Sequence, residues 1–214
     1  MPPHLISSVD EAVAMMKEPA VIEESDRILQ GSVHPRAVVL SESPLVYYVD
    51  DFVTDEECAH IVTKSTPAMK RARVSGEKDG RTSGGRTNSV AWMAADGDPV
   101  FESVEDKVCD MIGCRAECTE SFQVIHYDVE QEYRPHLDAY DTTTPHGQNN
   151  CKRGGNRLAT TLIYLSDVEA GGGTGFTQLG FEIEPKKRRV AVFYNCVPVR
   201  PAFPARQTAC PLSA

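Results

Sequence analysis

The sequence predicts an α+β domain with a mainly β core, folded as an antiparallel sandwich or barrel. Two observations carry this prediction. Apolar residues recur at helical spacing in two segments before residue 113, whereas after residue 118 they alternate with a period of two in several short runs. Helices followed by many short strands are typical of α+β domains with antiparallel sheets. The 214 residues fit one such domain over 44–214, preceded by an N-terminal appendage over 1–43.

Two helices are predicted ahead of most of the strands from their capping residues. Thr54 is followed by a glutamate at capping-box spacing, and Pro67 ends the helix that this box opens. Asp98 as the N-cap and Pro99 in the first turn begin the second helix. A further short helix is predicted in the appendage, after a capping box that begins at Ser8.

The strands are predicted from alternation and from runs of β-branched and aromatic residues. They cover residues 45–49, 122–127, 158–165, 181–183 and 190–194. A polar, glycine-containing loop over 142–156 is longer than ordinary strand connections. We expect this loop to be mobile and to lie over the mouth of a binding cavity, as lids do.

Charge and hydropathy argue against two classes of partner. The net charge of -9 leaves little positive potential for phosphates, which argues against nucleic acid and anionic membrane surfaces. The one basic run, residues 186–189, follows a proline and is interpreted as a solvated turn. No apolar stretch reaches the ~20 residues that span a bilayer, and no secretory signal is visible. The chain as given is therefore expected to be cytoplasmic.

The seven cysteines are an odd number, which without a visible signal peptide favours mostly reduced thiols. Three of them cluster at Cys109, Cys114 and Cys118, so zinc binding by this cluster is an alternative. Four and three residues separate them, no C-x-x-C pair is present, and Cys109 continues the apolar stripe of a helix. The cluster is interpreted as the end of that helix, with a metal-binding structural domain as the alternative.

The triplet His136-Leu-Asp138 is the candidate metal-binding motif of the sequence. On a strand, residues two apart point to the same face, so an imidazole and a carboxylate would lie side by side. They would supply two thirds of the facial triad that holds non-haem iron(II). We predict that both residues lie on one strand and converge on an internal cavity. Because H-x-D triplets often arise by chance, the residues around this one decide the interpretation.

The surrounding segments resemble those of prolyl 4-hydroxylases. The resemblance lies in Q-V-I-H-Y-D-V-E-Q-E-Y-R-P-H-L-D at 123–138, in G-G-N-R-L-A-T-T-L-I-Y-L-S-D-V at 154–168 and in G-G-G-T at 171–174. It continues at 52–60 and 86–87 upstream, and at 183–187 and 192–194 downstream, so it covers 45–212 in order. The resemblance implies a double-stranded β-helix, or jelly roll, with supporting N-terminal helices.

The resemblance also implies roles for six residues. These are His136 and Asp138 as iron ligands, Tyr127 and Thr174 as contacts of 2-oxoglutarate, and Tyr133 and Arg157 as residues near the peptidyl proline. Plainer interpretations stay open for three of them. The two tyrosines are also what half-buried strand residues look like, and Arg157 could be a surface cation at the start of a strand.

The C-terminal part departs from the family pattern. The family has a distal histidine in a stretch like H-x-G-C-P-V and then a lysine that pairs with 2-oxoglutarate, yet here no histidine follows His146. An ungapped match from Phe193 places Gln207 at the histidine position, and Arg188 stands where the family has a turn glycine. A neutral amide oxygen is a poorer iron donor than imidazole. We therefore expect weak iron binding from a truncated, misread or degenerate C-terminus.

By resemblance, the function is that of an iron(II)- and 2-oxoglutarate-dependent dioxygenase. It would hydroxylate peptidyl proline, decarboxylate 2-oxoglutarate to succinate and use ascorbate as a reductant. The expected partner is a proline-containing peptide or protein. The alternative is a catalytically impaired paralogue or truncated product that binds a proline-rich peptide without converting it. The resemblance implies the endoplasmic reticulum instead of the cytoplasm if further residues precede the N-terminus.

Overall fold

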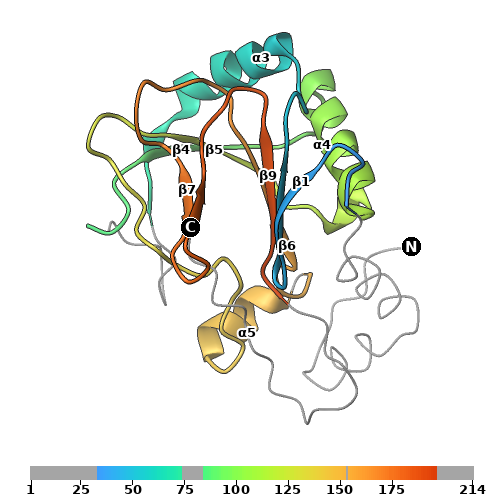
Figure 1. The fold of residues 1–214 in the computed structure, drawn as a ribbon, viewed down its shortest axis with the longest axis vertical. Coiled ribbons are helices and arrows are strands. Elements are labelled where there is room, and N and C mark those ends of the chain that lie inside the picture. The colour runs from blue at the N-terminus through green and yellow to red at the C-terminus, as the bar shows by residue number, and fades with distance from the viewer. Residues whose placement is uncertain (1–32, 74–83, 153, 197–214) are drawn as a thin grey trace.

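An antiparallel sheet of four strands lies at the centre of the computed structural model, which describes residues 33–73, 84–152 and 154–196 (Figure 1). The strand order is β1–β2–β9–β6, with the bounds β1 Val38–Glu42, β2 Leu45–Val49, β9 Val190–Tyr194 and β6 Ala159–Ile163. Every residue of β9 is buried, because the strand lies between β2 and β6 and its alternate side chains enter core clusters on the two faces of the sheet.

The two faces of this sheet pack against different layers, one on each side in Figure 1. Tyr47 of β2 shares a buried cluster with Met111 of helix α4 (Pro99–Ile112). Val46, the residue before it, faces the other way and shares a cluster with Phe176 of a small hairpin. The hairpin consists of β7 (Thr174–Phe176) and β8 (Phe181–Ile183). The alternation of a β-strand thus distributes the apolar residues between both layers.

A second sheet has the order β3–β4–β5 and lies beside the hairpin in Figure 1. Its strands are β3 Lys70–Arg71, β4 Ser89–Met93 and β5 Phe122–His126. Val124 of β5 packs in one buried cluster with Ile61 of α3 (Asp55–Ser65) and Phe101 of α4. The two helices therefore connect the second sheet to the first.

The predicted helix ends are confirmed in the structure. The backbone N–H of Glu57 donates to the Thr54 hydroxyl at 3.2 Å, and the N–H of Thr54 donates to the Glu57 carboxylate at 2.8 Å. This reciprocal capping box begins α3, and Pro67 lies in the short 3₁₀ turn that follows it. Asp98 caps α4 by accepting from two backbone N–H groups of the first turn.

The predicted strands are confirmed, with β5 and β6 shorter than expected. The loop expected over 142–156 is partly wrong, because it contains helix α5 (Pro145–Cys151). Thr144 caps this helix by accepting from Gly147 N–H at 3.0 Å, and the proline occupies the first helical position. Both signals are present in the sequence. Mobility of this segment stays a prediction.

Residues 38–42, which the sequence analysis placed in the N-terminal appendage, form β1 and pair with β2. The short helix expected after Ser8 and the expected third-ligand position, Gln207, lie outside the described residues. Among the helices that the structure describes, none is both long and apolar enough to cross a membrane.

The basic run at 186–189 forms a turn before β9, as predicted, but its side chains are paired rather than simply solvated. Lys186 and Arg189 bind the carboxylate of Asp50, at 2.8 and 2.6 Å. Lys187 binds Asp55 at 2.7 Å, and Arg188 binds Asp51 at 2.6 Å. Arg188 has a φ of 71°, which explains why a glycine would suit this position.

Candidate active site

His136 and Asp138 meet in the segment between β5 and α5. Nε2 of His136 lies 3.1 Å from Oδ1 of Asp138, and their side chains are 25% and 22% exposed. The two side chains lie beside each other, but the prediction that both lie on a strand is wrong, and their convergence on an internal cavity stays a prediction. Pro135 precedes the pair and has no N–H to donate to a ladder, and the last strand-like pairing is an isolated bridge from Tyr133 to Arg86.

The proton on His136 is placed by the backbone. Nδ1 lies 2.9 Å from the carbonyl oxygen of Arg134 and donates to it, so Nε2 either carries a second proton that it donates to Asp138 or presents a lone pair. That lone pair faces a carboxylate oxygen, and two acceptors at 3.1 Å need a cation or a second proton between them. Two ligand atoms about 2.1 Å from one metal and at right angles lie about 3.0 Å apart. The donor set and its spacing therefore fit two ligands of an octahedral metal ion.

The carboxylate of Asp138 is oriented from β6 and β9. Thr160 donates its hydroxyl hydrogen to Oδ2 at 2.7 Å, and Asn195 donates to the Thr160 hydroxyl at 2.8 Å. Burial by itself raises the pKa of Asp138, but the hydrogen bonds from His136 and Thr160 outweigh it and hold the pKa below its usual value. The ionised form, which binds metals, is the one that the site favours.

A second triplet of the same spacing, His126-Tyr-Asp128, provides an internal comparison. Its Nε2 lies 3.2 Å from Oδ1, but these side chains are 61% and 67% exposed. The other oxygen of Asp128 accepts from the Gln131 amide rather than from a buried hydroxyl. Distance alone does not separate the two pairs. Burial and the second hydrogen-bond partner do, and both favour His136 and Asp138.

A stack of aromatic and cationic side chains covers His136. The Tyr133 ring lies 3.7 Å from the imidazole, nearly parallel to it, and the guanidinium of Arg86 lies 4.5 Å from the centre of the Tyr133 ring. Arg86 is 6% exposed. Among the described residues it donates to neutral acceptors, namely the side-chain amides of Asn88 and Gln123 and a backbone carbonyl. Within the described ranges this buried cation has no carboxylate partner, and such a cation is suited to an anionic or electron-rich ligand.

Arg86 is the functional candidate that sequence reasoning missed. It belongs to one of the segments that carry the resemblance, and nothing in the local pattern distinguishes it from other arginines. Tyr127 is 42% exposed, and partial burial raises its pKa, whereas Arg86 lowers it and Tyr133 raises it. The structure thus brings the two predicted tyrosines together with an arginine that was not predicted.

Thr174 and Arg157 each bind a side chain outside the pair of His136 and Asp138. Thr174 is buried, and its hydroxyl lies 2.7 Å from the hydroxyl of Tyr164. Among the described residues, no hydrogen bond joins it to His136 or Asp138. Arg157 donates to the Glu120 carboxylate at 2.6 and 2.9 Å, so its charge is already paired. It also reaches the backbone carbonyl of Asp138, at 3.4 Å.

A complete metal centre is not assembled within residues 33–73, 84–152 and 154–196. There, no three histidine, cysteine, aspartate or glutamate side chains are placed to hold one ion. The cysteines that suggested zinc belong to this described part, and the third-ligand position, Gln207, does not. The fit to a metal therefore rests on two ligands, His136 and Asp138.

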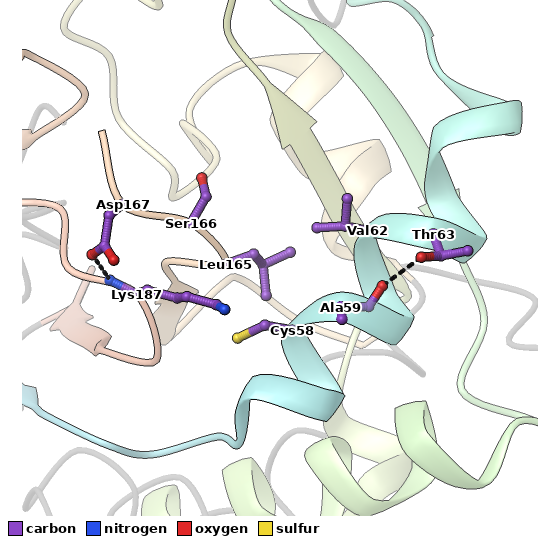
Figure 2. Close-up of a pocket in the computed structure, with 8 residues that line it drawn as sticks. All are labelled: Cys58, Ala59, Val62, Thr63, Leu165, Ser166, Asp167 and Lys187. Atoms are coloured by element: carbon purple, nitrogen blue, oxygen red, sulfur yellow. Dashed lines mark hydrogen bonds between the residues drawn. The ribbon is translucent and has the colours of Figure 1, made fainter. Parts of the chain in front are cut away.

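Two hollows on the described surface lie away from this pair. The larger, about 450 Å³, is lined by α3 and by the turns that follow β6 and precede β9, with Cys58, Leu165 and Lys187 around it (Figure 2). The other, about 330 Å³, lies on the β7–β8 hairpin. Neither is lined by His136 or Asp138.

The chain is similar to prolyl hydroxylases both in sequence and in fold. Residues 122–208 match the family model of the 2OG-Fe(II) oxygenase superfamily. Probable prolyl 4-hydroxylase 8 from Arabidopsis thaliana is 32% identical over 181 residues, which cover 75% of this chain and 61% of the relative. Prolyl 4-hydroxylase subunit alpha-1 from Gallus gallus is 31% identical over 174 residues, which cover 80% of this chain and 34% of that subunit.

The fold matches that of a viral collagen prolyl hydroxylase from Paramecium Bursaria Chlorella virus-1, solved as a 2OG complex, with a TM-score of 0.52. The match covers 72% of this chain and 80% of that one at 24% identity, and it establishes the fold alone. The fold is thus the double-stranded β-helix of prolyl hydroxylases. By sequence the chain is similar to prolyl 4-hydroxylases and, over residues 122–208, to the 2OG-Fe(II) oxygenase superfamily. It spans about 61% of the length of the first relative.

Proposed function

We propose that this chain is an iron(II)- and 2-oxoglutarate-dependent dioxygenase that hydroxylates peptidyl proline and releases succinate. The observation that carries the proposal is the pair of converging donors, Nε2 of His136 and Oδ1 of Asp138, 3.1 Å apart. These two atoms would hold the metal. The bound iron supplies the oxygen chemistry that couples decarboxylation of 2-oxoglutarate to hydroxylation.

The other residues of the site prepare these two donors. The backbone carbonyl of Arg134 fixes the tautomer of His136, and Thr160 occupies one oxygen of Asp138 so that the other stays directed at the imidazole. Such outer partners fix the orientation of ligands and raise their basicity. Tyr133 covers one face of the imidazole ring and limits the access of water to it.

The surface beside the metal ligands suits a proline-containing peptide. Tyr133 offers aromatic surface, and Arg157, which reaches the backbone carbonyl of Asp138 at 3.4 Å, is the candidate donor for the carbonyls of an extended chain. Extended proline-rich peptides are recognised in this way, by aromatic rings with hydrogen-bond donors between them. We include ascorbate as the expected reductant and 2-oxoglutarate as the cosubstrate, with Tyr127 and Thr174 as its candidate contacts.

A second candidate function is peptide binding without turnover. It is favoured by the absence of a third metal-ligating side chain near the pair within the described residues. An aromatic surface such as the Tyr133 ring requires no metal to bind a peptide.

The test is an anaerobic iron(II) titration together with succinate release in the presence of a proline-rich peptide. His136→Ala and Asp138→Asn should abolish metal binding, whereas His126→Ala and Asp128→Asn, in the exposed pair of the same spacing, should not. Loss of metal binding in the exposed pair instead would contradict the site assignment. Peptide binding without succinate release would establish the second function in place of the first.

A further inference from the structure

The C-terminal end of α4 brings two cysteines together. Gly113 has a φ of 76°, a left-handed conformation that glycine adopts readily, and it ends the helix. Its N–H donates to the carbonyl of Cys109 at 2.8 Å, and the N–H of Cys114 donates to the same oxygen at 3.1 Å. The chain thereby folds back over the last helical turn, and helix ends of this kind bring the side chains of residues 109 and 114 together.

The two thiols differ in their access to solvent. Cys109 is 8% exposed, whereas Cys114 is half-buried and packs against the core cluster that contains Tyr194. Cys118 is exposed and lies at the end of a separate short turn, Ala116–Cys118. No group of three metal-ligating side chains forms here within the described part of the chain. A pair of adjacent thiols is suited to two-electron chemistry rather than to a zinc site.

We propose that Cys109 and Cys114 form a dithiol modification site, which glutathione disulfide oxidises to an intramolecular disulfide. The thiolate of Cys114 attacks one sulfur of glutathione disulfide, forms a mixed disulfide and releases one glutathione thiolate. The sulfur of Cys109 then displaces the second glutathione and forms the Cys109–Cys114 bond. Two thiols lose two electrons, glutathione disulfide gains them, and the two thiol protons go to the two glutathione molecules released.

The order of the two steps follows from exposure. Cys114 reaches solvent and meets glutathione disulfide first. Burial, together with the neighbouring Cys114, raises the pKa of Cys109 to about 12, so Cys109 is a poor first nucleophile. Once Cys114 carries glutathione, its own charge no longer opposes ionisation of Cys109, and the resolving step becomes easier.

Trypsin distinguishes the proposed bond from its competitors. Cleavage after Lys107 and Arg115 releases peptide 108–115, which contains Cys109 and Cys114 but not Cys118. The full chain is equilibrated in glutathione buffers of increasing oxidised fraction, quenched with acid, alkylated under denaturing conditions and digested. We expect peptide 108–115 to change from doubly alkylated to unalkylated and lighter by two hydrogen atoms. Double alkylation at every ratio, or a link between this peptide and the one that contains Cys118, would overturn the proposal.

Two variants serve as matched controls. Cys118→Ser should leave the transition unchanged, because Cys118 lies outside the pair. Cys114→Ser should leave Cys109 alkylated at every glutathione ratio, because its partner is absent. Loss of the transition in Cys118→Ser, or continued protection of Cys109 in Cys114→Ser, would show that a different cysteine is the partner. The proposal does not depend on the proposed oxygenase activity.

Discussion

The hydroxyl of Thr160 donates to Oδ2 of Asp138 at 2.7 Å and leaves Oδ1 directed at Nε2 of His136. Thr160 lies on β6 of the central sheet, whereas Asp138 lies outside any strand. Thr160 thus determines which oxygen of Asp138 is available to a metal ion. The hydroxyl is itself held by Asn195, which follows β9. The geometry of the candidate metal site therefore depends on contacts between segments far apart in the chain.

Replacing this hydroxyl should weaken metal binding without unfolding the domain. Thr160→Val keeps the shape of the side chain but removes the donor, so we expect iron(II) affinity to fall by about 10- to 100-fold, as when other hydrogen-bond partners of metal ligands are removed. Thr161→Val, one residue along β6 and on the other face, is the control. Anaerobic titration measures the affinities, and equal affinities in the two variants would contradict the role of Thr160.

Restoring a histidine at the position that matches the family motif should tighten metal binding. Gln207→His would complete two histidines and one carboxylate, so iron(II) affinity should rise by about tenfold or more if residue 207 reaches the pair. The same titration in the His136→Ala background is the control, because the gain requires the other ligands. No gain in the otherwise unmodified chain would show that the ungapped match is wrong at this position.

A methyl group at Gly147 should destabilise α5. A Cβ there would overlap the backbone carbonyl of Asp141, which cannot move without opening the turn before the helix. Gly147→Ala should therefore cost about 1–3 kcal/mol in the free energy of unfolding and increase amide exchange in α5. Gly154→Ala, where a Cβ meets no atom within 4 Å, is the matched control and should be neutral. Equal exchange in both variants would contradict the close approach.

Two buried tyrosines should respond oppositely to loss of the hydroxyl. The Tyr164 hydroxyl donates to the carbonyl of Ile183 at 3.1 Å and also contacts Thr174, so Tyr164→Phe should cost about 1–3 kcal/mol. The Tyr194 hydroxyl is buried without a hydrogen-bond partner among the described residues. Tyr194→Phe should therefore be neutral or stabilising. Chemical denaturation of both variants checks the contrast, and a larger loss for Tyr194→Phe would refute it.

The contact of Asp50 with the basic turn should depend on pH. Hydrogen bonds from Arg189 and Lys186 lower the pKa of Asp50 from 3.8 to about 2 in the folded state. A folded pKa below the unfolded one stabilises the fold above the unfolded pKa, and this contribution disappears as pH falls from about 4 to 2. Asp50→Asn should thus lower the melting temperature at pH 7 but not at pH 2. The control is Asp51→Asn, because the Asp51 side chain is 54% exposed.

Local signals in the sequence predicted much of the fold, because caps and alternation act over a few residues. Thr54 and Asp98 begin helices as expected, and the five strands are confirmed. Helix α5 was not predicted, because the polar segment has no apolar stripe. Its start is nevertheless indicated by Thr144 as the N-cap and by the proline that follows.

The site was harder to predict, because its contacts are distant in sequence. The proximity of His136 and Asp138 was predicted, but the strand expected to carry them does not form. Pro135 ends the strand-like pairing before it reaches them. The triplet at 126–128 has the same spacing and almost the same distance, so spacing alone cannot rank the two pairs. The contacts of Thr160 and Arg86 depend on tertiary packing and were not predictable from local pattern.

The position of β9 has a consequence for how the protein is made. Val46 of β2 pairs with Phe193 of β9. The ribosome synthesises β2 early and β9 much later, so β2 cannot complete its pairing until β9 has been made. Until residue 194 has left the ribosome, β2 presents an open edge and the buried side chain of Tyr47. During that interval the nascent chain exposes apolar strand surface, which chaperones recognise and which other unfinished chains can pair with. Ribosome stalling between β6 and β9 would therefore produce aggregation-prone fragments rather than smaller folded domains.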